Sequence, residues 1–359
     1  MELSTRYLGL DLRNPLVASA SPLSKTVDGV RRLADAGVGA VVLYSLFEEQ
    51  LRREAELNAR MAEVGTDSFA ESLSYFPPAA DEDHGPRRYL SLLERAAAAV
   101  SVPVIGSING STPGSWAGYA RSMQDSGAAA IELNIYYLPG DPHVSGRDVE
   151  QSHLDILARV KDAVTVPVAV KLSPYFSATA EMARRLDLAG ADGLVLFNRF
   201  LQPDIDPETL AVAPGTSLSR AAEARLPLTW ITLLHGRIGA SLAATTGVEG
   251  STELIKYLLA GADVVMPASA LSRHGPECAA VLLDGLCEWM GRKGYATVEE
   301  LRGLLAVPVG VDEPHASAGT TSAHYGKPTA PTTALVTSKW PLVTSYGSFD
   351  PCRNVDGSV

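Results

Sequence analysis

The sequence predicts an α/β protein that folds as a (β/α)8 barrel, the TIM barrel. The first observation behind this prediction is an internal repeat, in which a helix ends at a glycine and a short, buried, apolar run follows. Four segments follow this pattern: DAGVGAVVL (35–43), DSGAAAIEL (125–133), LAGADGLVL (188–196) and LAGADVVMP (259–267). The second observation is a pair of near copies with proline at the first strand position, where a missing N–H costs least. They are VSVPVIGSI (100–108) and VTVPVAVKL (164–172).

The remaining strands are expected in NPLVASA (14–20) and IGASLAATTG (238–247), which bring the number of strands to eight. Amphipathic stretches that predict helices lie between these segments, at 26–37, 87–100, 112–127, 148–164 and 250–261. Apolar strands that alternate with helices indicate a parallel sheet covered on both faces. Repeated units of this kind favour a closed barrel. The alternative is a doubly wound sheet, but no GxGxxG follows the first strand.

Composition and charge exclude several classes of protein. The chain has 359 residues, 46% of them hydrophobic, which is enough to bury a large core. Its net charge of −11 argues against a nucleic-acid surface, which needs clustered Lys and Arg. We expect no signal peptide and no membrane helix, because no apolar run reaches about 18–20 residues. Three scattered cysteines, Cys278, Cys287 and Cys352, indicate neither disulfides nor a zinc or iron–sulfur site and favour the cytoplasm.

The sequence divides into two regions. We expect residues 1–306 to form the barrel and residues 307–359, rich in Ser, Thr, Ala, Gly and Pro, to form a poorly ordered, low-complexity tail. Three long connections follow strands within the barrel: 46–86, 135–148 and 198–219. Because the loops after the strands form the active-site face of a TIM barrel, we expect these connections to act as a lid. The charged start of the first connection predicts an exposed helix.

Polar residues at the ends of strands are candidate site residues: Asn134, Lys171 and Asn198. Lys171 is the sharpest signal, because a lysine at the end of a buried strand is desolvated unless it meets an anion or a polar ligand. Its partner is either a ligand or Glu132, which has the same strand parity as Asn134. Both interpretations can hold together.

Small residues after the last two strands predict a phosphate site. ATTGV (244–248) and PASAL (267–271) each end a strand and open a helix, so backbone N–H groups can approach an anion. A phosphate-binding site on one side of the barrel mouth, with Lys171 on the other side, indicates an elongated phosphorylated cofactor. Flavin mononucleotide (FMN) fits, with Lys171 near the N1/O2 edge of the ring, where a positive charge stabilises the anionic reduced flavin.

The ordered motifs NPLVASA, IELN, VPVAVKLSPYF, LFN, ATTGV and PASAL resemble the dihydroorotate dehydrogenase family over about residues 1–306. The resemblance implies an FMN-containing TIM barrel that oxidises dihydroorotate to orotate in pyrimidine biosynthesis. It implies that Ala18 and Ser19 line the flavin site and that Asn198 reaches the substrate. The residues implied to hydrogen-bond the ring are Ser107, Asn134 and Lys171. Those implied to hold the phosphate are Thr246, Gly247, Val248, Ala268 and Ser269.

The chain departs from the family on the substrate side. Tyr44 stands where the family has a lysine after the second strand, and the family's substrate loop is not recognisable in SFAESLSYFPP (68–78). After the fourth strand the family carries a Cys or Ser base, whereas this chain has Tyr137, followed by Leu138 and Pro139 in place of a Pro–Asn pair. The resemblance therefore implies a retained flavin half and a rewritten substrate half that includes Tyr44.

Tyr137 changes the expected proton chemistry. A phenol with an ordinary pKa near 10 is only about 0.1% ionised at about pH 7, so a tyrosine base costs roughly a further thousandfold in rate. Tyr137 can instead act as an acid that donates its proton while reduced flavin gives hydride to an activated double bond. The alternative is that Tyr136 and Tyr137 only pack the loop. Arg199 either neutralises a substrate carboxylate or forms a surface salt bridge.

Three functions remain open from the sequence. The leading hypothesis is an FMN-dependent dehydrogenase acting on CH–CH donors, with a small-molecule substrate that is dihydroorotate or another planar unsaturated compound. Its electron acceptor is then a soluble molecule or a partner protein, and the resemblance also implies a homodimer. The second hypothesis is a non-catalytic flavin-binding protein. The third is a flavin-free barrel enzyme in which Lys171 forms a Schiff base with a phosphorylated metabolite.

Histidines do not indicate a metal site. His84, His143 and His153 lack metal-ligand spacing, so no metal is expected. His235 lies near the end of an expected helix before the seventh strand, where a lone histidine is expected to be structural.

Overall fold

A computed structural model of the protein describes residues 1–309 except 48–85, 111–115, 136–138, 200–203 and 214–217. Met1–Ala306 form one compact unit. The helix expected after residue 47, Tyr136 and Tyr137, and the tail beyond residue 309 lie outside the described residues. The predictions for them therefore stay predictions.

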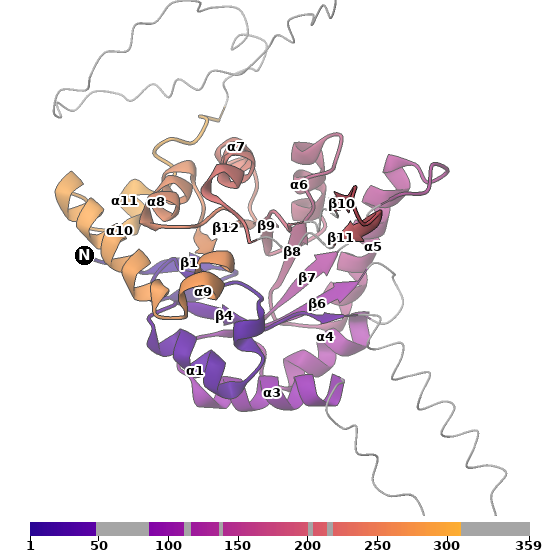
Figure 1. Ribbon diagram of the computed structural model, residues 1–359, viewed down its shortest axis with the longest axis horizontal. Helices are drawn as coiled ribbons and strands as arrows, with labels where there is room; N and C mark the ends of the chain where they lie inside the picture. The colour runs from indigo at the N-terminus through magenta and orange to yellow at the C-terminus, as the bar shows by residue number, and fades with distance from the viewer. Residues whose placement is uncertain (48–85, 111–115, 136–138, 200–203, 214–217, 310–359) are drawn as a thin grey trace, which may run out of the picture. The chain divides into compact units, whose positions relative to one another are not determined.

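Eight parallel strands form a barrel, which confirms the predicted fold (Figure 1). In pairing order they are β3 (Val17–Ala18), β4 (Ala40–Val42), β6 (Val104–Gly110), β7 (Ala130–Ile135), β8 (Val168–Leu172), β9 (Gly193–Leu196), β12 (Ser241–Thr245) and β13 (Val264–Met266). The barrel closes where Leu16 bridges Val265 and the Val265 N–H donates to the Pro15 carbonyl at 2.8 Å. This closure excludes the doubly wound alternative, and each strand overlaps one predicted segment.

Helices cover the outside of the barrel, as the alternating pattern predicts (Figure 1). Those between strands are α1 (Val27–Asp35), α3 (Pro86–Ala99), α4 (Trp116–Asp125), α5 (Gly146–Ala163), α6 (Thr179–Leu188), α7 (Arg225–Leu234) and α8 (Ser251–Ala260). Local signals fix two of the starts: Thr26 accepts the Gly29 N–H before α1, and Ser145 forms a capping box with Asp148 before α5. After β13 follows α9 (Ser269–His274), the helix expected to open at PASAL. α10 (Cys278–Lys293) and α11 (Val298–Leu301) come next, and the sequence analysis does not predict them.

A short hairpin closes the N-terminal end of the barrel, and the sequence pattern does not predict it. β1 (Thr5–Tyr7) and β2 (Leu10–Leu12) pair antiparallel, and the Leu8 N–H donates to Ser241 Oγ at the start of β12. Tyr7, Leu8 and Leu12 pack against the inward side chains of the strands, which include Val17, Val42, Ile105, Val195 and Met266. The hairpin therefore completes the core inside the barrel.

The repeated GAD sequence has a structural role at this same end. Asp192 precedes β9, and its carboxylate accepts the N–H of Val168 in β8 at 2.7 Å. Asp263 precedes β13, and its carboxylate accepts the N–H of Leu242 in β12 at 2.7 Å. Charge-assisted bonds of this kind are stronger than neutral ones, so they fix the register of adjacent strands.

The connections after strands contain structure of their own. β5 (Leu46–Phe47) pairs with β6, so the first long connection begins as a strand. β10 (Asp204–Asp206) and β11 (Ala211–Ala213) form a hairpin within the connection 198–219. Two 3-10 turns, η1 (Pro22–Ser24) and η2 (Ala221–Ala224), precede α1 and α7.

Several expected absences can be checked in the described part of the chain. No helix there is long and apolar enough to cross a membrane. Within the same residues, no group of His, Cys, Asp and Glu side chains could hold a metal ion. Cys278 and Cys287 carry free thiols.

Candidate functional site

A cavity of about 150 Å³ opens at the C-terminal ends of β3, β8, β9, β12 and β13. Active sites of TIM barrels lie at this end of the strands. The lining includes eight of the residues predicted from the sequence: Ser19, Lys171, Asn198, Arg199, Thr246, Val248, Ala268 and Ser269. The volume lies below the usual range of about 300–1,000 Å³ for small-molecule pockets.

Lys171 lines this cavity from β8, where it is in register with Asn134 of β7. Its side chain is buried, and Nζ lies 3.6 Å from Oε1 of Glu132, which is 1% exposed. The interpretation of Glu132 as the partner of Lys171 is therefore confirmed, and Lys171 also lines the cavity, where its contact with a ligand stays a prediction. An ammonium carries three donors. Among the described residues Glu132 is its one partner, so Lys171 can also donate to a ligand.

Asn134 and Asn198 are joined by a hydrogen bond. Asn198 Nδ2 donates to Asn134 Oδ1 at 2.8 Å, and the Asn198 N–H donates to the Leu172 carbonyl at 2.7 Å. Among the residues that the structure describes, each amide keeps donor or acceptor atoms without a partner. The pair can therefore donate to and accept from a planar polar ligand at the same time.

Ser107 lies in β6 with its side chain inside the barrel. It is fully buried, and its Oγ lies 2.9 Å from Ser45 Oγ and 3.5 Å from Glu132 Oε1. Ala18 is also buried, one residue before Ser19. Neither Ala18 nor Ser107 lines the cavity formed by the described residues.

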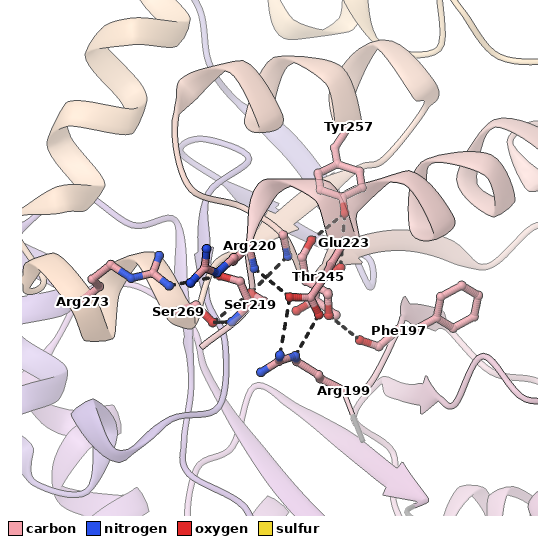
Figure 2. Close-up of polar contacts among 11 residues, drawn as sticks. Phe197, Arg199, Ser219, Arg220, Glu223, Thr245, Tyr257, Ser269 and Arg273 are labelled. Carbon is pink, nitrogen blue, oxygen red and sulfur yellow. Dashed lines mark hydrogen bonds and ion pairs between the residues drawn. The ribbon is translucent and has the colours of Figure 1, made fainter. Parts of the chain in front are cut away.

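Ser219, Ser269 and Gly247 form a hydrogen-bonded cluster, the serine cradle, at the strand β12 and β13 side of the cavity (Figure 2). Ser219 Oγ accepts the Gly247 N–H at 3.2 Å and donates to Ser269 Oγ at 2.9 Å, while the Ser219 N–H donates to Ser269 Oγ at 3.0 Å. Gly247 has φ +73°, and a Cβ there would lie 2.5 Å from the Ala224 nitrogen. Only glycine fits this position. The Gly247 N–H and both Ser219 donors are used within the cluster, so among the described residues the Ser269 hydroxyl proton is the donor of this cluster without a partner.

Thr246, which directly precedes Gly247, has a strained backbone conformation with φ +76°. Its Oγ1 donates to the Phe197 carbonyl at 3.1 Å, and the Tyr257 hydroxyl donates to the Thr246 carbonyl at 2.6 Å (Figure 2). Burial, followed by the Glu253 carboxylate, raises the pKa of the Tyr257 phenol, so this donor keeps its proton. A residue held at positive φ costs about 1–3 kcal/mol, which these bonds offset.

Two arginines flank the cavity in ion pairs (Figure 2). Arg199 Nε lies 2.9 Å from Glu223 Oε2, so the surface salt bridge expected as one alternative is present. Arg273 pairs with Glu249 at 3.3 Å and donates to the Ser219 carbonyl at 3.2 Å. A substrate carboxylate would compete with Glu223 for Arg199.

Tyr44 lies on the other side of the barrel mouth, after β4. Its ring packs edge-on against Tyr89 at 5.1 Å, and the Lys25 ammonium lies 5.8 Å from the centre of the Tyr44 ring. Burial raises the pKa of the Tyr44 phenol, and the charge of Arg88 partly offsets this. A cation from the connection after β3 thus lies beside the tyrosine that stands in place of the family's lysine.

The structure also shows which site features the sequence analysis missed. Ser219 lies at the end of the connection 198–219, where SLSRAAEA carries no recognised motif, and Lys25 lies in a segment read only as a helix start. Two serines directly before a helix, in a loop after a strand, are the signal that could have indicated Ser219.

The remaining candidates do not join the site as it is described. Tyr137 lies outside the described residues. His235 contacts the Gly261 carbonyl through Nδ1 at 3.0 Å, near the start of β13 and away from the cavity, which agrees with a structural role. His153 is buried in α5, and His143 is exposed.

The fold and the cavity define a TIM-barrel protein with a cavity at the C-terminal ends of its strands. The profile of the dihydroorotate dehydrogenase family matches residues 2–290, and the chain belongs to this family. It is thereby an enzyme of the oxidoreductase class that acts on CH–CH donors.

Several relatives carry one name, dihydroorotate dehydrogenase B (NAD(+)), catalytic subunit. The protein of Methanothermobacter thermautotrophicus is 27% identical over 311 residues, which cover 84% of this chain and 98% of the relative. That of Methanocella arvoryzae is 28% identical over 312 residues, 85% of this chain and 98% of the relative. That of Thermoplasma acidophilum is 26% identical over 323 residues, 84% of this chain and 98% of the relative.

Proposed function

We propose that the chain is an FMN-dependent oxidoreductase of the dihydroorotate dehydrogenase type. Its substrate is dihydroorotate, or another planar carboxylated compound of the same CH–CH class, and its place is in pyrimidine biosynthesis. The observation that carries this proposal is one cavity that joins the buried ammonium of Lys171 to the serine cradle. The names of the relatives, which are catalytic subunits for dihydroorotate, support the same reaction.

Two observations support FMN as the cofactor. The Lys171 ammonium is buried, faces the cavity and has one partner in the described chain, so it suits an electron-rich ring edge. The cradle brings the Gly247 N–H and the hydroxyls of Ser219 and Ser269 together at a position where a Cβ cannot fit. Among the described residues the Ser269 hydroxyl proton has no acceptor within this cluster, so it can donate to a phosphate beside the small residues that follow β12 and β13.

Each part of the cavity has a role in this proposal. Bound FMN would accept a hydride from the substrate at N5. Lys171 would donate to the N1/O2 edge and stabilise the negative charge that develops there, in a site where the low dielectric strengthens the interaction. Ser219, Ser269 and the amides of Gly247, Val248 and Ala268 would orient the phosphate, so the ring edge lies against Lys171.

The Asn134–Asn198 pair and the cations of the barrel mouth would face the substrate. The unused amide atoms of the pair match the alternating donors and acceptors of a pyrimidine ring. Arg199 would bind a substrate carboxylate by exchanging Glu223 for it. Tyr44, with Lys25 beside it, would form the polar wall of the substrate site on the side opposite Arg199.

Proton transfer is the step for which the chain differs from the family. We propose that Tyr137 accepts the substrate proton while hydride leaves for the flavin, and that it donates this proton in the reverse reaction. The pKa of a free phenol, about 10, favours the reverse direction. Electrons would leave to a soluble acceptor or a partner protein, since several relatives are named as NAD(+)-linked catalytic subunits. A homodimer, which the resemblance implies, belongs to the same proposal.

The visible spectrum of the purified protein, recorded anaerobically before and after dihydroorotate is added, tests the proposal. We expect a flavin absorbance that bleaches with dihydroorotate. Absorbance that persists with dihydroorotate and bleaches with dithionite would retain the cofactor and exclude this substrate. A protein that binds no flavin even when FMN is supplied would overturn the proposal, and borohydride trapping of Lys171 would then favour a Schiff-base enzyme.

A further inference from the structure

The barrel interior contains a buried carboxylate that the proposed chemistry does not use. Glu132 lies in β7 and is 1% exposed. Its two polar contacts in the described chain are Lys171 Nζ at 3.6 Å and Ser107 Oγ at 3.5 Å, both longer than an ordinary hydrogen bond. Ser107 is itself held by Ser45 Oγ at 2.9 Å. Glu132 is therefore held next to Lys171 mainly by charge.

We infer that Glu132 is a positioning residue that fixes the Lys171 ammonium beneath the flavin ring and sets the reduction potential of the bound flavin. This inference rests on the proposed function. A carboxylate buried without a cation is strongly unfavourable, so Glu132 and Lys171 hold each other in place. The pair is close to neutral before a ligand binds, and a negatively charged ring edge must share the ammonium with Glu132.

This sharing of the ammonium should shift the oxidised–reduced equilibrium of the flavin in one direction. The Glu132 carboxylate offsets part of the attraction between Lys171 and negative charge on the reduced ring, so it favours the oxidised cofactor. The Glu132 charge also acts on a second group inside the barrel, the Tyr7 phenol. Burial, and next the Glu132 carboxylate, raise the pKa of the Tyr7 phenol well above its usual value.

Glu132→Gln in the FMN-loaded full-length protein is the direct test, because glutamine keeps the shape and removes the charge. We expect the oxidised–reduced equilibrium, measured by spectroelectrochemical titration, to shift toward reduced flavin by at least about tenfold, or about 30 mV for a two-electron couple. Sulfite, an anion that adds to oxidised flavin at N5, should also bind more tightly by at least about tenfold, since the same ammonium stabilises the charge left on the ring. A merely structural residue would leave both values unchanged.

Two further variants complete the design. Asp263→Asn removes a carboxylate that pairs with Arg302 at the N-terminal end of the barrel, and it should leave the potential unchanged. Glu132→Asp keeps the charge and should hold the potential between those of the parent and Glu132→Gln. If Glu132→Gln does not hold FMN, the sulfite affinity of Glu132→Asp decides: an increase supports the inference and parental affinity overturns it.

The outcomes separate this inference from the proposed function. A parent protein that binds no FMN overturns both. A Glu132→Gln protein that binds FMN with the parental potential and the parental sulfite affinity overturns the inference alone.

Discussion

Both ends of the barrel contain acids and cations, half-buried at the N-terminal end and buried at the C-terminal end, and the two ends satisfy these charges differently. At the N-terminal end, Asp192 accepts the Val168 N–H at 2.7 Å and pairs with Lys161 at 2.6 Å. Asp187 likewise accepts the N–H groups of Gly239 and Ala240. At the C-terminal end, Lys171 has Glu132 at 3.6 Å as its one partner in the described chain.

The difference separates stability from function. Charges with several short bonds hold strands in register and have little left to offer a ligand. A buried charge with one long contact is expensive for the fold, and such groups concentrate at functional sites. Substitutions at the two ends should therefore have different readouts, and each prediction below tests that separation.

Lys171→Met should have the largest effect on chemistry, and it should also lower stability because Glu132 is left buried without its cation. It removes the positive charge at the ring edge, and loss of one such electrostatic group typically costs about 10²–10³ in rate. Stopped-flow measurement of flavin reduction by substrate gives the value. Lys161→Met, which breaks an ion pair on α5 instead, is the matched control and should keep the parental rate. Parental reduction by Lys171→Met would contradict the separation.

Asp263→Asn should affect stability and leave the site intact. The Asp263 carboxylate accepts the Leu242 N–H and pairs with Arg302, whose side chain is 19% exposed. Breaking a fully buried pair costs about 3–5 kcal/mol, so partial exposure lowers the expected loss to about 2 kcal/mol. Urea unfolding measures this loss. FMN affinity should stay parental, and a weaker affinity with unchanged stability would reverse the assignment of the two ends.

Gly247→Ala should weaken the binding of FMN. Gly247 has φ +73°, and the new Cβ would meet the Ala224 backbone. The strain of about 1–3 kcal/mol should lower FMN affinity by about tenfold or more, measured by quenching of flavin fluorescence. Gly118→Ala in α4, where a Cβ meets nothing within 4 Å, is the control and should be neutral or slightly stabilising. Equal FMN affinity in both variants would argue against the cradle.

His153 should give a small pH effect that is independent of the site. Burial lowers the pKa of His153, with the Val149 carbonyl partly opposing this. Below about pH 6.5 the unfolded chain then binds a proton that the folded chain refuses, so stability falls as pH falls, by at most about 1.4 kcal/mol per pH unit.

Urea unfolding between about pH 5 and 7.5 measures this slope. The slope should flatten in His153→Leu and persist in His143→Gln, which changes an exposed histidine. A parental slope in His153→Leu would assign the dependence to another group.

The strands could be predicted from the sequence because a buried parallel strand has to be apolar along its length, as VPVAVKL is. Lys171 stood out for the same reason. The hairpin of β1 and β2 could not be predicted, since strands of three residues carry no period. α10 has a weak apolar stripe over Cys278–Lys293 and follows the last repeat, so no flanking strand marks it.

The site was predictable where it is built from strand ends and not where it is built from loops. Strand parity places Lys171 and Asn134 correctly, because alternate residues of a barrel strand point inward. Parity also pointed to Glu132 as a partner of Lys171. Ser219 reaches the cavity through the path of a long connection, and no local pattern fixes that path.

Binding of FMN compared with binding of riboflavin to the same flavin-free protein tests the central claim most directly. The claim is that the C-terminal end holds a phosphorylated flavin between the serine cradle and Lys171. Charge-assisted hydrogen bonds to a phosphate are worth roughly 1.5–3 kcal/mol each, so FMN should bind at least about 100-fold more tightly than riboflavin. Equal affinity for the two flavins, or no binding of either, would contradict the account.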